Sequence, residues 1–251
     1  MIKGSLFLLG ACALFLVSAT PRAWAGGEGS PLIWQSPVTI SGDSDVSTTG
    51  SLVAAFNMFG SAVAVNGVTF SAFNVNGGSQ TATNGNFSFT ESPGILVPSS
   101  SLGSALAPFS NLSANYQTLL STAISTSDNN TLTLTMTGLT LGLTYQFQWW
   151  VNASNFNPNI GFDTTATSGP QVVTLDANTT NANGGVGQMV IGTFFAGANF
   201  QTIAFTGTNI TQAPTVNAFQ LRVIPEPGTL ALFAVGAAGL AALLRQRRRT
   251  L

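Results

Sequence analysis

Two alternating runs, NTLTLTMT at residues 130–137 and TYQFQWWVN at residues 144–152, decide the fold of this sequence. The first run alternates threonine with leucine or methionine, and the second places an apolar residue at every odd-numbered position. Successive side chains of a β-strand point to opposite faces, so this pattern is typical of strands. The glycine-rich residues 138–142 favour a turn between the runs. We therefore expect the two strands to pair like a hairpin.

Further alternating runs extend the β pattern along the chain. They lie at residues 38–41, 67–75, 86–90, 171–176, 187–195, 200–207 and 216–223. About nine short strands predict an all-β fold, either an antiparallel two-sheet sandwich or a jelly roll. One short helix is expected over residues 112–124, where apolar residues recur at three- and four-residue spacing and Ser113 is the candidate N-cap.

The turn between the two deciding runs has a specific likeness. GLTLGLTY at residues 138–145 resembles the strand-turn-strand corner of fibronectin type III and galactose-binding-like sandwiches. Leu141 stands where that corner often has a proline. The helix and the number of strands favour the galactose-binding-like form.

The N-terminal 25 residues have the zones of a secretory signal peptide. A cation at Lys3 precedes an apolar run at residues 6–17, and AWA at residues 23–25 offers the small residues that signal peptidase requires. We expect cleavage after residue 25. The alternative is a lipoprotein signal with Cys12 as the acceptor, although the apolar run continues beyond that cysteine.

The C-terminus has the features of a membrane anchor. Residues 229–244 are uncharged, and a helix of that length spans about 24 Å, slightly less than the usual minimum for crossing a bilayer. A basic cluster follows and is expected to stay on the cytoplasmic side. It consists of Arg245, Arg247, Arg248 and Arg249. The alternative is a buried core helix with a solvated basic end.

The segment before this helix identifies the kind of anchor. Pro225 and Pro227 remove two backbone donors and disfavour helix in the residues before them, so this stretch is expected to be extended and accessible. VIPEPGT at residues 223–229, the apolar segment and the terminal arginines together resemble the PEP-CTERM sorting signal. Its motif residues would be Pro225, Glu226, Pro227 and Gly228.

That resemblance implies a partner and a location. An exosortase, a membrane transpeptidase-like enzyme of bacteria that make extracellular polysaccharide, would read the signal. The chain would be held in the inner membrane at least transiently, and its domain would then stay in the cell envelope or become extracellular. The expected division is a signal peptide at 1–25, an exported domain at 26–224 and a sorting segment at 225–251.

The composition of the exported domain excludes most catalytic and binding sites. Residues 26–224 contain no histidine, cysteine or lysine, and Arg222 is their only basic residue. A nucleophile with an imidazole base, a Schiff-base lysine and a zinc site with nitrogen or sulfur ligands are therefore excluded. One arginine cannot neutralise a run of phosphates, so nucleic acid is not an expected partner.

Two carboxylate chemistries remain open in this domain. Its acidic residues are Glu28, Asp43, Asp45, Glu91, Asp128, Asp163 and Asp176. A carboxylate pair can hydrolyse a glycoside, and oxygen ligands can bind Ca²⁺. Asp43 and Asp45 are the candidate calcium ligands, and an Asx turn is the favoured alternative for them. No other cofactor is expected.

These observations favour a non-catalytic protein of the cell envelope or extracellular matrix that associates with exopolysaccharide. The alternative is a lectin-like module, in which Trp150 stacks on a sugar beside Gln148 and Asn152. Alternation places Trp150 on the face opposite Trp149, so the lectin hypothesis requires that face to be open. If both faces are covered, Trp150 is an ordinary core residue. A glycoside hydrolase is the third hypothesis.

Overall fold

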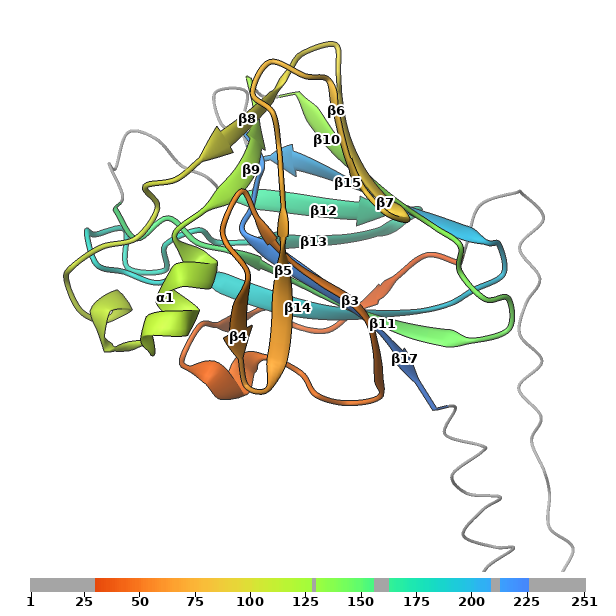
Figure 1. The fold of residues 1–251 in the computed structure, drawn as a ribbon, viewed down its shortest axis with the longest axis horizontal. Coiled ribbons are helices and arrows are strands. Elements are labelled where there is room, and N and C mark those ends of the chain that lie inside the picture. The colour runs from red at the N-terminus through yellow and green to blue at the C-terminus, as the bar shows by residue number, and fades with distance from the viewer. Residues whose placement is uncertain (1–29, 128–129, 156–162, 209–212, 226–251) are drawn as a thin grey trace, which may run out of the picture.

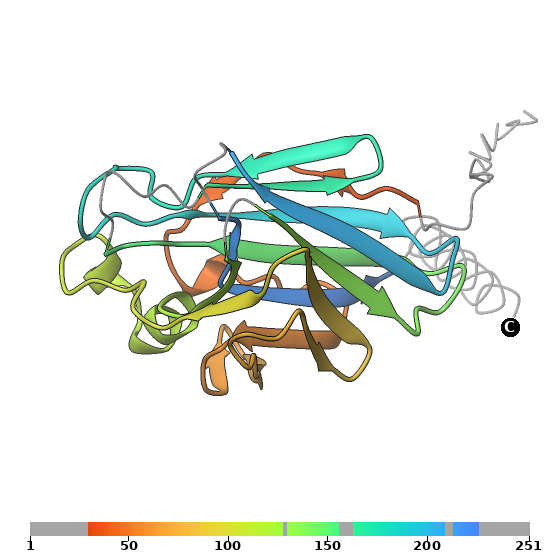
Figure 2. The same cartoon turned by 90° about the horizontal axis from the view of Figure 1, so that it is seen from above.

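The computed structural model describes residues 30–127, 130–155, 163–208 and 213–225. These residues form an all-β domain of sandwich-like sheets with one short α-helix (Figures 1 and 2). The predicted signal peptide and membrane helix lie outside the described residues. Within the described part of the chain, no helix has the length and apolar character needed to cross a bilayer.

The larger sheet has eight strands, and its last strand in sequence lies in its interior. In spatial order the strands are β1 (Ile33–Trp34), β14 (Gln188–Phe195), β11 (Thr144–Val151), β17 (Ala218–Ile224), β3 (Ser51–Met58), β5 (Val68–Phe73) and β4 (Val63–Val65), with β2 (Val38–Thr39) also paired to β14. Strands β3 and β5 are parallel. Strand β17 pairs antiparallel with β11 on one side and β3 on the other.

The second sheet has six antiparallel strands and packs across the larger one. Its order is β13 (Gln171–Leu175), β12 (Thr164–Ser168), β15 (Phe200–Gly207), β10 (Thr131–Thr137), β7 (Phe87–Ser92) and β6 (Thr81–Asn84). A third sheet of three strands comprises β16 (Thr215–Val216), β9 (Ala123–Thr126) and β8 (Leu96–Ser99).

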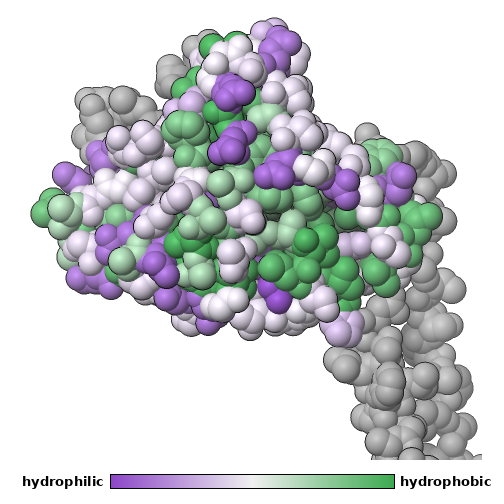
Figure 3. All heavy atoms as spheres, in the orientation of Figure 1, coloured by the Kyte–Doolittle hydropathy of each residue, from purple (hydrophilic) through white to green (hydrophobic). Residues whose placement is uncertain are grey.

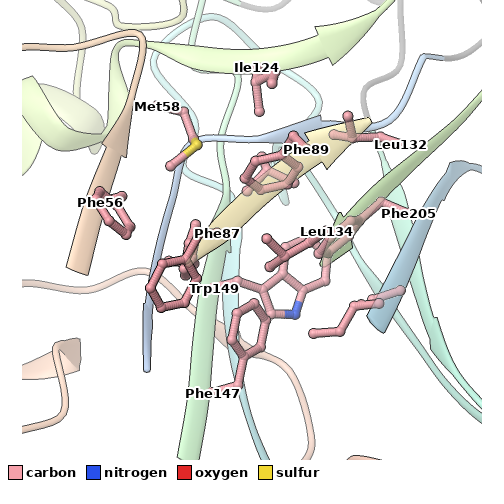
Figure 4. Packing of buried hydrophobic residues seen from close by; sticks show 14 of the residues in the cluster. Phe56, Met58, Phe87, Phe89, Ile124, Leu132, Leu134, Phe147, Trp149 and Phe205 are labelled. Carbon is pink, nitrogen blue, oxygen red and sulfur yellow. The ribbon is translucent and has the colours of Figure 1, made fainter. Parts of the chain in front are cut away.

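The main core lies between the two large sheets. One buried cluster contains Leu132 and Leu134 of β10, Phe205 of β15, and Phe147 and Trp149 of β11 (Figure 4). The rings of Trp149 and Phe205 meet edge to face with centroids 4.9 Å apart. Fully burying a large apolar side chain stabilises a fold by about 1.5–3 kcal/mol, so this alternating apolar face holds the sheets together.

A second core covers the opposite face of the larger sheet. Trp150 of β11 lies in it with Phe70 of β5, and their rings are 5.6 Å apart. The helix α1 (Ala114–Leu120) adds the buried side chains of Tyr116 and Leu119. The larger sheet is therefore covered on both faces.

The predicted strands and helix are largely confirmed. Each of the nine predicted strands corresponds to an observed strand, with ends shifted by a few residues. The helix begins one residue after Ser113, whose hydroxyl accepts the N–H of Tyr116 at 3.1 Å as an N-cap. It ends at Leu120, because Ala123 and Ile124 form part of β9 instead.

The predicted hairpin is wrong. Strand β10 pairs with β7 and β15, whereas β11 pairs with β14 and β17, so the turn at 138–143 crosses from one sheet to the other. Alternation shows which face of a strand is apolar but does not identify its partner. The crossing is fixed by Tyr145, whose hydroxyl accepts the N–H of Thr140 at 2.9 Å, as in a tyrosine corner. The structure thus supports a sandwich, and the jelly roll stays a prediction.

Candidate functional site at the end of strand β17

The site of interest is the point where the folded domain meets the predicted sorting segment. The paired part of β17 ends at Ile224, which lies opposite Thr144 of β11. Val223 lies opposite Ser51 of β3. Pro225 follows at once and is exposed. The sorting segment therefore begins directly at the end of an interior strand, without an intervening linker.

A row of buried polar side chains leads along the outer face of the larger sheet to this point. We call Gln148 of β11 and Gln220 and Arg222 of β17 the polar ladder. Gln220 Nε2 donates to Gln148 Oε1 at 2.6 Å, and Arg222 Nη1 donates to Gln220 Oε1 at 3.2 Å. All three side chains are buried. Each link satisfies a polar group that would be costly to bury alone.

The polar ladder is hydrogen-bonded to a backbone segment that crosses the outer face of the larger sheet. We call this segment, residues 45–50, the strap. Gln148 Nε2 donates to the carbonyl of Asp45 at 2.6 Å, and Gln148 Oε1 accepts the N–H of Ser47 at 2.9 Å. Gln220 Nε2 donates to the carbonyl of Ser47 at 3.0 Å. The strap is thus fixed by amide groups across its first half.

Arg222 fixes the second half of the strap. Its Nε donates to the carbonyl of Thr49 at 2.8 Å, and its Nη2 donates to the carbonyls of Thr48 at 3.1 Å and Gly50 at 2.8 Å. The guanidinium is a rigid fork of donors, which suits several carbonyls at once. Its residue is only 7% exposed, and desolvation lowers the pKa of Arg222.

Gly50 places the end of the strap against the end of β17. Its φ of +78° lies in the left-handed region that glycine adopts without strain. A Cβ at this position would overlap the carbonyl oxygen of Val223. Glycine is therefore required here both by the backbone conformation and by the close approach of the two segments.

The predicted glycan contacts are wrong. Trp150 is fully buried at 0% exposure, as are Gln148 and Asn152. The indole Nε1 of Trp150 donates to the hydroxyl of Tyr116 at 2.8 Å, and Asn152 Nδ2 donates to the carbonyl of Leu120 at 3.3 Å. The cause is the cover that α1 and the strap place over this face. Trp150 is therefore a core residue.

The predicted calcium ligands form a hydrogen-bonded turn. The carboxylate of Asp45 accepts the N–H groups of Ser41 at 2.7 Å and Gly42 at 3.0 Å, and that of Asp43 accepts the hydroxyl of Ser113 at 2.6 Å. Among the described residues, no group of three or more His, Cys, Asp or Glu side chains is placed to hold a metal. Calcium binding by this pair stays a prediction.

The turn also affects Tyr116. Its hydroxyl donates to Asp45 Oδ2 at 3.3 Å. Burial raises the pKa of Tyr116 well above its ordinary value, and the charge of Asp45 raises it further. The hydroxyl therefore stays protonated and can keep its place between Trp150 and Asp45.

Two other carboxylates lie near each other at the opposite end of the domain. Asp163 Oδ1 accepts the N–H of Ala177 at 2.9 Å, and Asp176 Oδ1 accepts the N–H of Asn178 at 2.7 Å. Desolvation raises the pKa of Asp176, and the charge of Asp163 adds to this effect. Both side chains thus hold the backbone that follows β13.

Sequence reasoning missed the polar ladder and Gly50. A signal for the ladder was present, since glutamine or arginine occupies every second position at Gln146 and Gln148 and again at Gln220 and Arg222. Such spacing on two strands predicts a polar row. Of the sorting motif, only Pro225 is described. The other motif residues and the arginine cluster lie outside the described residues, namely Glu226, Pro227, Gly228, Arg245, Arg247, Arg248 and Arg249.

Comparison with known proteins identifies the sorting segment. Residues 223–249 match the family model of the PEP-CTERM protein-sorting motif, so that prediction is confirmed, and the role of exosortase substrate follows from this motif. None of the curated proteins matches the chain.

Two solved structures show limited similarity to this chain. The plant receptor-like kinase FER has a TM-score of 0.45 at 13% identity, over 69% of this chain and 42% of that one. The ANX2 ectodomain from Arabidopsis thaliana has a TM-score of 0.46 at 12% identity, over 71% of this chain and 54% of that one. The chain thus spans about half the length of each, or less.

Proposed function

We propose that this PEP-CTERM protein is a non-catalytic component of the cell envelope or extracellular matrix that associates with exopolysaccharide after sorting. The PEP-CTERM motif implies an exported surface protein that is processed at a C-terminal membrane-anchoring region. The observation that supports a polysaccharide partner is a neutral surface of hydroxyl groups on the second sheet.

This surface, which we call the hydroxyl face, is the outward side of the six-stranded sheet. Its members are exposed or half-buried and comprise Thr81, Thr83, Ser88, Thr90, Thr131, Thr133, Thr135, Thr165, Thr167, Thr174, Thr202 and Thr206. They form rows across the strands, since Thr133 lies opposite Thr90 and Thr135 lies opposite Thr202. Neighbouring hydroxyls also meet directly, as in the 2.9 Å contact between Thr165 and Thr174.

The spacing of the hydroxyl face fits a repeating neutral polymer. Each threonine hydroxyl both donates and accepts, as the hydroxyls of a polysaccharide do. Adjacent strands are about 4.8 Å apart and same-face residues about 6.7 Å apart, so the groups form a regular grid. One such hydrogen bond is worth only about 0.5–1.5 kcal/mol, and useful binding therefore requires many contacts along a chain.

The described carboxylates support the non-catalytic part of the proposal. Buried Glu91 accepts the hydroxyl of Ser127 at 3.0 Å and the amide of Asn130 at 2.9 Å. Asp163 and Asp176 likewise accept backbone N–H groups. These acidic groups hold loops in place. Incubation with host exopolysaccharide should therefore yield no new reducing ends, and their appearance would overturn this part of the proposal.

Retention of the mature protein on immobilised host exopolysaccharide tests the association. Replacing Thr133, Thr135 and Thr202 together by valine keeps the side-chain shape and removes three hydroxyls, so retention should fall about tenfold or more. The same three positions changed to serine should retain binding. Thr69→Val, on an exposed position of β5, is a second control. Unchanged retention in the valine variant, with the fold intact by circular dichroism, would refute the association.

A lectin-like module would behave differently in the same assay. A lectin site binds a short oligosaccharide, which would then compete with the polymer at saturating concentration. A distributed hydroxyl face would be displaced only by the polymer itself, because its affinity comes from many weak contacts. Competition by a short sugar would therefore favour the lectin over the matrix protein.

A further inference from the structure

The end of the domain from which the sorting segment leaves has an exposed apolar surface. Leu52 and Val53 of β3 are 43% and 48% exposed, and Leu141 and Leu143 of the β10–β11 turn are 61% and 37% exposed. We call these four residues the apolar rim. Figure 3 shows apolar surface gathered over the start of β3 and over the β10–β11 turn.

Strand pairing places the apolar rim beside the last residues of β17. Ser51, next to Leu52, lies opposite Val223. Thr144, next to Leu143, lies opposite Ile224. The two halves of the rim therefore flank β17 on either side at the point where Pro225 begins.

The length of the following chain fixes how far this end can be from a membrane. Only Pro225–Gly228 separates Ile224 from the apolar segment that starts at residue 229. Four fully extended residues reach about 14 Å at most. The polar headgroup layer on one side of a bilayer is about 5–8 Å thick. While the apolar segment is in the membrane, the rim must therefore lie close to the lipid surface.

The charges of the domain favour the same orientation. Glu91 lies opposite Leu132 at the start of β10, whereas the rim follows the end of that strand. Asp163 and Asp176 flank the pair Thr164 and Leu175, also at the far end. Among the described residues, none at the rim is acidic, and Arg222, their one basic residue, lies beside it. Asp43 and Asp45 lie by the start of the strap, where the carbonyl of Asp45 accepts from Gln148, and not at the rim. An anionic lipid surface would repel the far carboxylates, which favours the rim as the end that faces the membrane.

We propose that the domain rests on the membrane surface through the apolar rim while the chain is still tethered, so that Pro225 is held at the level of the lipid headgroups. This orientation rests on the membrane-anchoring part of the proposed function. It gives the sorting segment a fixed height and direction, whereas a long linker would let the scissile region move freely.

Fluorescence quenching in vesicles tests this orientation. The mature chain, residues 26–251, which has no cysteine, is reconstituted into phosphatidylethanolamine and phosphatidylglycerol vesicles that contain brominated lipid. A fluorophore is attached at Leu141→Cys or, as a control at the far end, at Ala182→Cys. We expect strong quenching at position 141 and none at 182. Equal quenching at both positions, in protein that floats with the vesicles, would overturn the membrane contact.

A matched pair of variants separates the rim from general effects. Leu52→Asn with Leu143→Asn should lower the quenching at position 141 about twofold or more, because two apolar side chains no longer favour the lipid interface. Leu106→Asn, which changes an exposed leucine at the far end, should leave it unchanged. Equal effects of the two changes would contradict the proposal.

Two further outcomes are informative. The fluorophore at position 141 could instead be shielded from a water-soluble quencher without being quenched by lipid. If that shielding rises with the protein-to-lipid ratio, the rim contacts a second copy of the chain, and the membrane contact is overturned. Failure of the chain to float with vesicles would instead refute the membrane anchor and, with it, the orientation proposed for the domain.

Discussion

The indole Nε1 of Trp150 donates a 2.8 Å hydrogen bond to the hydroxyl of Tyr116, which joins the middle of the larger sheet to helix α1. The same hydroxyl donates to Asp45 at 3.3 Å, so the helix, the sheet and the strap meet at one buried oxygen. This contact closes the face on which the alternative, lectin-like hypothesis places a glycan. Its energetic value can be measured directly.

Removing the Tyr116 hydroxyl should destabilise the domain. Tyr116→Phe leaves the indole N–H of Trp150 buried without its acceptor, which costs about 1–3 kcal/mol. The loss is read from the free energy of unfolding in urea. Adding Trp150→Phe removes the unpaired donor. The double variant should therefore lose clearly less free energy of unfolding than the sum of the losses in the two single variants. Strict additivity would show that the hydrogen bond contributes nothing.

Arg222 should hold the strap specifically through its fork of donors. Arg222→Met keeps the apolar stem but leaves the carbonyls of Thr48, Thr49 and Gly50 without these donors, and we expect a loss of about 1–3 kcal/mol. Arg222→Lys should recover only part of it, because an ammonium group cannot reproduce the planar fork. Hydrogen exchange of residues 45–50 should rise in both variants. Unchanged exchange in Arg222→Met would refute this role.

Gly50 and Gly67 offer a matched comparison of two glycines. Both have positive φ, at +78° and +73°, but a Cβ at Gly67 would meet nothing within 4 Å. Gly67→Ala should therefore cost about 1 kcal/mol from backbone strain alone. Gly50→Ala should cost more, since the methyl group also overlaps the carbonyl of Val223. Equal unfolding midpoints for the two variants would show that the strap and β17 can separate freely.

Asp176 should give the stability of the domain a pH dependence. Burial raises its native pKa above the ordinary 3.8, so the folded state binds the proton more tightly than the unfolded chain. Stability contributed by this group therefore falls as pH rises from the unfolded to the native pKa. Asp176→Asn, which keeps an acceptor for Asn178, should raise the melting temperature near pH 7, with the gain disappearing toward about pH 3. A gain that is equal at both pH values would contradict this assignment.

The sorting motif predicts the mass of the mature protein. As an exosortase substrate, the chain should lose its arginine cluster in cells that contain the enzyme and keep it in cells that lack the enzyme. Intact-protein mass spectrometry distinguishes the two forms. A mature chain that retains Arg245 to Arg249 in the presence of exosortase would show that the segment is a lasting anchor.

Much of the fold could be predicted because its strands have one apolar face. The alternation of β10 located both the strand and its buried leucines. Strand β3, with the sequence SLVAAFNM, was missed because residues 52–56 form a continuous apolar run that does not alternate with polar residues. Strand partners could not be predicted, since they depend on contacts between segments that are distant in sequence.

Less of the candidate site could be predicted from the sequence. Alternation correctly separated Trp149 from Trp150 but could not show that the second face is covered. The cover comes from Tyr116 and from the strap, which lie 34 residues or more from Trp150 along the chain. Arg222 looked like an isolated charge because its partners are backbone carbonyls, and carbonyls have no sequence signature.

The interior position of β17 also determines how the domain responds to mechanical force. A pull on the tethered C-terminus acts lengthwise on this strand, while its hydrogen bonds to β11 and β3 run across it. The load therefore shears the backbone hydrogen bonds on both sides of β17 at once, and many of these bonds must break together. An edge strand would instead peel away one bond at a time. A domain tethered at its C-terminus can thus bear tension without unravelling from that end.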